Sequence, residues 1–68
     1  MRQVSIAGAR VSAGFSQAEL AEKMGISRTT VAEWESGKRE MRTPYVQLFC
    51  AITGFSADDL ILPKKITK

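Results

Sequence analysis

The chain has 68 residues, 44% of them hydrophobic, which is enough for one small helical domain and too apolar for a disordered tail. It contains no His and a single Cys, Cys50, so it offers neither an intrachain disulfide nor the residues of a metal site or a Cys–His nucleophile. The net charge of +3 suits a polyanionic partner, although many soluble proteins share such a balance.

Glycine, proline and N-cap residues divide the chain into five predicted helices, and no run alternates apolar and polar residues as a strand would. The first helix is expected over residues 3–13. Ile6, Ala9 and Arg10 share one face at helical spacing, and Gly14 follows as a terminator. That face is the expected inner surface of the helix.

The second helix has the clearest start signal in the chain. Ser16 and Glu19 have the spacing of a capping box, in which each side chain bonds the backbone amide of the other residue. Phe15 and Leu20 are placed to form a hydrophobic staple across that start. Gly25 is expected to end the helix, because this position often needs a positive φ.

A third helix is predicted over residues 28–36, with Ser27 as its N-cap. Only about four residues separate it from the second helix, too few for the two to run antiparallel, so the third helix must cross steeply and project from the body. A projecting helix of this kind can enter the major groove of duplex DNA. Val31 and Trp34 share one side of the helix and are expected to pack inward.

The opposite side of the third helix is polar. Arg donates to guanine, Glu accepts from cytosine and Thr can do either, so this side is able to read base edges. An ordinary solvated helix face is the alternative interpretation. Basic residues gather at the start of the helix and in the loop after it, where a groove-docked helix would meet phosphates. They are Arg28, Lys38, Arg39 and Arg42.

The fourth predicted helix has Thr43 as its N-cap and Pro44 at its first position, and it ends at Gly54. Its expected buried stripe is Tyr45, Leu48, Phe49 and Ile52. A short fifth helix is expected from Ser56 to Pro63, with two aspartates in its first turn favouring the positive end of the helix dipole. A basic tail, residues 64–68, is expected to fray.

The segment GFSQAELAEKMGISRTTVAEWESGKR resembles the Cro and phage-repressor (XRE) family of helix-turn-helix DNA-binding domains. The resemblance extends over about Ile6 to Leu62 and includes the Ser-Gln pair, the Met-Gly turn and the Trp-Glu pair of the third helix. It implies a compact five-helix, all-α domain over residues 1–63, usually a homodimer on DNA. The helix-turn-helix would be formed by the second and third helices.

The resemblance also implies roles for individual residues. Base contacts are expected from the third helix, phosphate contacts from the start of the second helix and from the following loop, and dimer contacts from the segment Gly54–Leu62. The expected DNA-binding residues are Gln17, Ser27, Arg28, Thr29, Glu33, Lys38, Arg39 and Arg42. The expected structural ion pair is Arg10 with Glu35, and the expected dimer residues are Phe55 and Asp58. An acidic Glu33 departs from the amide that is commoner at that position of the family.

The favoured interpretation is a sequence-specific, DNA-binding transcriptional regulator, most simply a repressor, bound as a homodimer to a palindromic operator. A helix-turn-helix module that binds a protein, or an antitoxin component, is the alternative. We expect no enzyme, metal, cofactor or small-molecule ligand, because no constellation of residues for them is present. No apolar run approaches the ~20 residues of a membrane span and no signal segment opens the chain, so a cytoplasmic protein without a membrane partner is expected.

Overall fold

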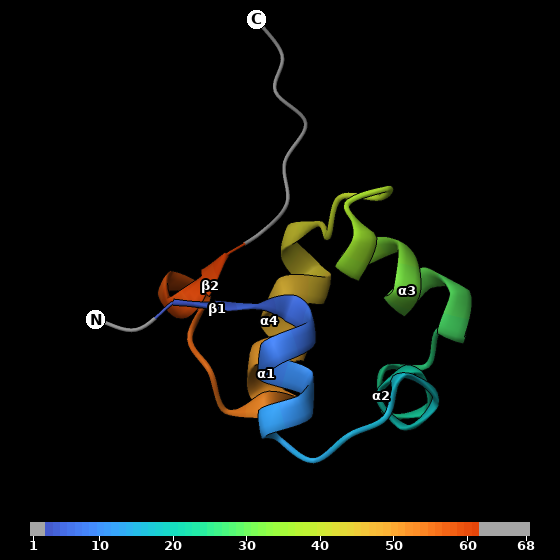
Figure 1. Cartoon of the computed structure of the whole chain (residues 1–68), viewed down its shortest axis with the longest axis horizontal. Coiled ribbons are helices and arrows are strands. Elements are labelled where there is room, and N and C mark those ends of the chain that lie inside the picture. Colours follow the sequence, from blue (N-terminus) through green and yellow to red (C-terminus); the bar gives the residue numbers. More distant parts are fainter. Residues whose placement is uncertain (1–2, 62–68) are drawn as a thin grey trace, which may run out of the picture.

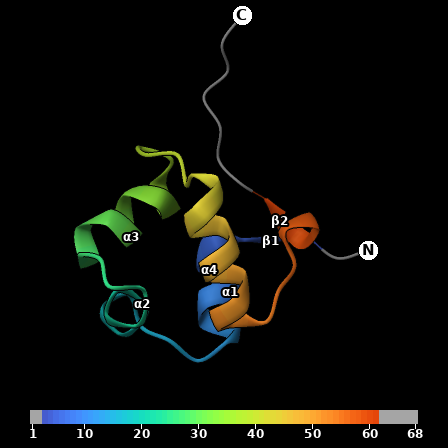
Figure 2. The same cartoon turned by 180° about the vertical axis from the view of Figure 1, so that it is seen from behind.

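The computed structural model describes residues 3–61, and these form four α-helices, one 3₁₀ helix and a two-stranded sheet (Figure 1). The α-helices are α1 (Ile6–Ser12), α2 (Gln17–Met24), α3 (Arg28–Ser36) and α4 (Thr43–Thr53). The short elements are β1 (Val4–Ser5), the 3₁₀ helix η1 (Ala57–Asp59) and β2 (Leu60–Ile61). Helices α1 and α4 lie together, and α2 and α3 form the other side of the molecule in both opposite views (Figures 1 and 2).

The expected fold is confirmed in part: the described residues are mostly helical, but they also form a small parallel sheet. Strand β1 pairs with β2 in the register Val4 to Leu60 and Ser5 to Ile61. A strand of two residues is too short to show an alternating pattern in the sequence, and its pairing joins segments from opposite ends of the domain. The fold is therefore mostly helical, with four α-helices in the described residues instead of five.

The predicted fifth helix is a single 3₁₀ turn that gives way to β2. At Leu60 the backbone is already extended, with φ −92° and ψ 137°. The extended chain places Leu60 in the core, where it is 7% exposed, and satisfies backbone groups by pairing with β1. Burial and pairing thus outweigh the local preference for a helix. The predicted end of this helix at Pro63 and the tail over residues 64–68 lie outside the described residues.

Two helix starts differ from the prediction. Helix α1 begins at Ile6 rather than at residue 3, because Ser5 is its N-cap and accepts a hydrogen bond from the Gly8 amide at 2.9 Å. Helix α4 has Arg42 as its N-cap, without a side-chain capping bond, and Thr43 is already helical. Both differences are shifts of a boundary and leave the order of the α-helices unchanged.

The hydrophobic core receives side chains from all four α-helices and from β2. Trp34 and Phe49 are the largest of its fully buried side chains. The prediction that Trp34 packs inward is confirmed, because only 2% of it is exposed. The buried residues are Ile6, Ala9, Leu20, Ala21, Met24, Val31, Trp34, Met41, Val46, Phe49 and Leu60.

The inner face of α4 was only partly predicted. Phe49 is buried as expected, but Val46 lies beside it in the core, whereas Tyr45 and Leu48 are 41% and 39% exposed. The sequence analysis had assigned the largest side chains of the helix to its inner face. Met41, in the loop before the helix, is also part of the core, since it is only 6% exposed. Helix α4 therefore faces α1 and α2 through a narrower stripe.

Candidate nucleic-acid interface

The turn between α2 and α3 depends on Gly25, which has a left-handed backbone with φ +73°. The amide of the next residue, Ile26, donates to the carbonyl oxygen of Ala21 at 3.0 Å. The Ser27 hydroxyl then caps α3 by accepting from the Thr30 amide at 3.2 Å. Hydrogen bonds thus satisfy backbone groups at the end of α2 and at the start of α3, and they fix the angle between the two helices locally.

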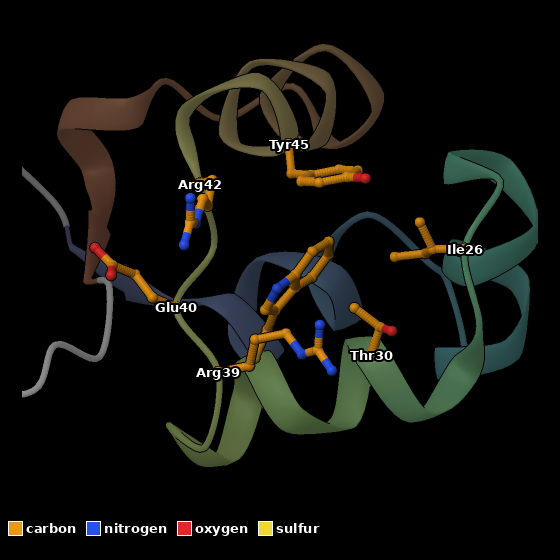
Figure 3. Close-up of a pocket in the computed structure, with 7 residues that line it drawn as sticks. Ile26, Thr30, Arg39, Glu40, Arg42 and Tyr45 are labelled. Carbon is orange, nitrogen blue, oxygen red and sulfur yellow. The ribbon is translucent and has the colours of Figure 1, made fainter.

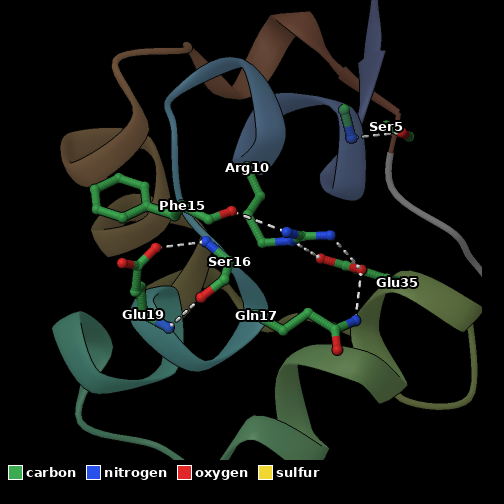
Figure 4. A network of polar contacts seen from close by, with 8 residues as sticks. Ser5, Arg10, Phe15, Ser16, Gln17, Glu19 and Glu35 are labelled. Carbon is green, nitrogen blue, oxygen red and sulfur yellow. Dashed lines mark hydrogen bonds and ion pairs between the residues drawn. The ribbon is translucent and has the colours of Figure 1, made fainter.

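Helix α2 starts with the predicted capping box (Figure 4). The Glu19 amide donates to Ser16 Oγ at 3.0 Å, and the Ser16 amide donates to Glu19 Oε1 at 2.8 Å. These two bonds hold the first turn of α2 in place. Gln17, the first helical residue and a predicted phosphate contact, is thereby fixed in position at the surface, where it is half-buried.

An ion pair anchors α3 to α1 (Figure 4). Arg10 Nε lies 2.6 Å from Glu35 Oε2, and the side chains are 14% and 10% exposed. Arg10 also donates from Nη1 to the carbonyl oxygen of Phe15 at 2.9 Å. Gln17 Nε2 donates to Glu35 Oε1 at 3.0 Å. The network connects α1, the following turn, α2 and α3, so it holds the two halves of the helix-turn-helix against the rest of the domain.

The outward side of α3 forms one wall of a shallow hollow of about 350 Å³. Arg28, Thr29 and Lys38 are exposed there, and Glu33 is half-buried. Four of the predicted DNA-binding residues are therefore brought together on one surface. The hollow is lined by Arg28, Thr29, Ala32, Glu33, Ser36 and Lys38. Ala32 keeps the middle of this surface low, which allows a close approach by another molecule.

Ser27 stands apart from these residues in its interactions. Its hydroxyl lies 3.1 Å from Thr30 Oγ1 in addition to capping the helix. The side chain is exposed, but its polar atom is already engaged. The structure therefore gives Ser27 a capping role, and its expected contact with DNA remains a prediction.

Arg39, a predicted phosphate contact, is instead paired with a predicted base reader. Its Nε donates to Glu33 Oε1 at 2.8 Å, and its backbone amide donates to the Glu33 carbonyl oxygen at 3.2 Å. The reversal of the chain at Gly37, with φ +86°, brings residue 39 back beside α3. The sequence separation of six residues is not a helical spacing, so pattern analysis does not reveal this pair.

A cavity of about 390 Å³ lies on the flank of α3, between that helix, the following loop and the start of α4 (Figure 3). Trp34 and Tyr45 both line it, and their ring centroids are 5.5 Å apart. Arg42, another predicted phosphate contact, lines this cavity and is exposed. The sequence analysis missed the cavity, although Ile26, Thr30 and Trp34 follow one another every four residues. Its lining is Ile26, Thr30, Trp34, Arg39, Glu40, Arg42 and Tyr45.

The predicted dimer residues lie after α4. Phe55 is half-buried and packs against the core, so only part of its ring is available to another molecule. Asp58 is exposed in η1. The described part of the segment Gly54–Leu62 thus presents the exposed charge of Asp58, the partly covered ring of Phe55 and the exposed side chain of Ile61.

Over residues 3–61, no group of three or more His, Cys, Asp or Glu side chains is placed to hold a metal ion. Within the same range, no helix combines the length and the apolar character needed to cross a membrane. Burial raises the pKa of the Cys50 thiol, and the negative charge of Asp59 raises it further. The thiol therefore stays protonated at neutral pH, which makes it a weak nucleophile.

These elements define a helix-turn-helix domain whose second helix, α3, carries an exposed polar face. A family model described as helix-turn-helix matches residues 6–60. The chain therefore belongs to the Cro and phage-repressor (XRE) helix-turn-helix family, a family of DNA-binding regulatory domains. Comparison with curated proteins and with solved structures finds no match.

Proposed function

We propose that this protein is a sequence-specific repressor of transcription that places α3 in the major groove of duplex DNA. The observation that carries the proposal is the asymmetry of α3. Val31 and Trp34 are buried at 0% and 2% exposure, and the opposite side presents Arg28 and Thr29 to solvent. A helix held firmly on its apolar side and polar on the other fits base readout.

The proposed DNA contacts are of two kinds: readers, which contact base edges, and anchors, which contact phosphates. Arg28, Thr29 and Glu33 contact base edges, because they lie on the outward side of α3. Lys38 and Arg42 contact phosphates, which position the domain without carrying sequence information.

Gln17 joins these anchors through the amide nitrogen that already bonds Glu35. A side-chain amide nitrogen carries two hydrogens. One is donated to Glu35 at 3.0 Å, and the second is available to a phosphate oxygen. The N-terminus of α2, where Gln17 is the first helical residue, also favours an anion. We therefore place the start of α2 on the sugar–phosphate backbone.

The proposal includes a homodimer on a palindromic operator. One recognition helix reads only a few base pairs, which is too little to select a site in a genome. Two copies related by a two-fold axis would read half-sites about 34–36 Å apart. The surface around Phe55 and Asp58 is the proposed contact between the copies. A regulator of this kind works in the compartment that holds the DNA, in keeping with the cytoplasmic location expected from the sequence.

Selection of bound duplexes from a random DNA pool tests this function. The expected result is one enriched motif that is an imperfect palindrome, with two half-sites about one helical turn apart. A matched selection with an Arg28→Ala, Thr29→Ala variant, which keeps the core and the caps, should lose the motif. A pool that shows no enrichment with the parent protein would contradict sequence-specific binding and favour the alternative, a module that binds a protein.

A further inference from the structure

The ion pair between Glu33 and Arg39 links two surface depressions. A residue that only contacts a base, or only contacts a phosphate, would not require such a position. Glu33 lines the hollow on the outward side of α3, and Arg39 lines the aromatic cavity on the flank of the same helix. The 2.8 Å bond from Arg39 Nε to Glu33 Oε1 therefore crosses the ridge between the two depressions. The side chains are 58% and 29% exposed, with Arg39 the more open of the two.

Arg39 reaches this position through the fold of the loop. Its backbone amide is bonded to the carbonyl oxygen of Glu33 at 3.2 Å, so the main chain as well as the side chain is held against α3. In the close-up, its guanidinium group lies beside Thr30, over the cavity (Figure 3). Lys38, the preceding residue, instead lines the hollow on the outward side. Neighbouring basic residues thus serve different sides of the helix.

We propose that Arg39 determines base specificity by positioning Glu33, and is not a phosphate anchor. This inference rests on the proposed function. A carboxylate brought into the groove approaches a dense array of phosphates, which repel it. Arg39 supplies a compensating positive charge 2.8 Å away. The attraction between this charge and Glu33 becomes stronger as water leaves the groove.

The geometry also orients the carboxylate. Oε1 of Glu33 already accepts a hydrogen bond from Arg39, so Oε2 is the more open acceptor for a base. Among base edges in the major groove, only the amino groups of cytosine and adenine donate to it. Arg39 therefore holds the carboxylate in one orientation, and the pair acts as one unit that recognises an exocyclic amino group.

We expect a variant without Arg39 to fold normally but to discriminate less well between bases. An ion pair this exposed contributes little to folding. In the complex, an unpaired Glu33 would lose both its orientation and its charge compensation. The consequence is a change in base preference at the position that Glu33 reads, without loss of a phosphate contact.

The test compares Arg39→Ala, Glu33→Gln and the double variant on the motif selected by the parent protein, with Lys38→Ala as the matched control. Discrimination against the wrong base at the Glu33 position should fall about fivefold or more in Arg39→Ala, within the range of coupling between contacting residues. In the Glu33→Gln background, removing Arg39 should change that discrimination by no more than about twofold. Arg39→Lys, which keeps the charge, should restore part of the loss.

The salt dependence of binding separates positioning from anchoring. Each phosphate contact contributes about 0.9 to the slope of log affinity against log salt for duplex DNA. Arg39→Ala should keep the parent slope, whereas Lys38→Ala should lower it by about 0.9 and keep the base preference. A lower slope with unchanged base preference in Arg39→Ala would overturn the inference and make Arg39 an anchor. Failure of the parent protein to select any motif would instead overturn the proposed function, so the two failures are distinguishable.

Discussion

Arg10 shows how one side chain can hold several elements of so small a domain. It bonds Glu35 and the Phe15 carbonyl oxygen while staying 14% exposed. Removing it leaves the Glu35 carboxylate, 10% exposed, with the amide of Gln17 and without a positive charge. Such a change in a largely buried pair costs about 3 kcal/mol, a large part of the total stability of a domain this size.

We therefore expect Arg10→Ala to lower the free energy of unfolding by about 3 kcal/mol in urea denaturation followed by circular dichroism. The matched control is Arg28→Ala, which removes an exposed arginine and should change the free energy by less than about 0.5 kcal/mol. Equal midpoints for the two variants would show that the network does not stabilise the domain.

Short-range sequence patterns predicted the contacts of some residues and not those of others. Ser16 and Glu19 could be paired because a capping box acts over three residues, and Trp34 because helical periodicity decides its side. The bond between Arg39 and Glu33 depends on a chain reversal in the loop, which no periodic pattern encodes. Roles in DNA binding for these and the other outward residues remain predictions that the experiments above address.

The α2–α3 turn shows an element boundary that the sequence predicts well. Gly25 has φ +73°, and a Cβ atom added there would meet no atom within 4 Å. The cost of Gly25→Ala is therefore that of the left-handed backbone alone, about 1 kcal/mol. We expect this loss of unfolding free energy by denaturant titration. Gly25→Asn should lose less, because Asn tolerates this conformation better. A stabilised alanine variant would contradict the assigned backbone.

The sheet shows an element that sequence analysis misses. Local patterns around residues 56–63 favour a helix, but the pairing of β2 with β1 and the burial of Leu60 make the chain extended. The extended form places Leu60 in the core and Ile61 in solvent, at 7% and 50% exposure. Adjacent side chains of a strand point to opposite faces, so this pair of residues tests the register of β2.

Leu60→Ala should lower the unfolding free energy by about 2–4 kcal/mol, because it removes buried methyl groups and leaves a cavity. Ile61→Ala, its neighbour on the opposite face, should cost less than about 1 kcal/mol. Thermal unfolding by calorimetry gives both values. If Ile61→Ala lowered the unfolding free energy more than Leu60→Ala, the register assigned to β2 would be contradicted.

At the scale of the whole molecule, the proposed assembly is two chains on one operator. A domain of 68 residues can hardly present a large dimer surface and still keep a core, so we expect the free protein to be mainly monomeric. On a palindromic duplex, sedimentation should show two chains bound cooperatively. Binding of one chain to an isolated asymmetric half-site at all concentrations would contradict this assembly.

Asp58→Lys is the cleanest disruption of that assembly, because Asp58 is exposed and its replacement leaves the core intact. We expect the variant to keep its far-ultraviolet circular dichroism spectrum and to bind the palindrome less cooperatively. Phe55 is a poorer choice, since it packs against the core and its replacement would also disturb folding. Unchanged cooperativity in Asp58→Lys would move the proposed contact away from η1.

The central claim is that α3 and its flanking cations bind duplex DNA, and the salt dependence of affinity tests it most directly. The anchors Lys38 and Arg42 of the two bound chains neutralise four phosphates of the operator, which gives a slope of log affinity against log salt of about −3.6. Raising the salt fourfold should then weaken binding of the selected operator about a hundredfold or more, measured by fluorescence anisotropy. An affinity for every duplex that stays the same across that range would contradict the account.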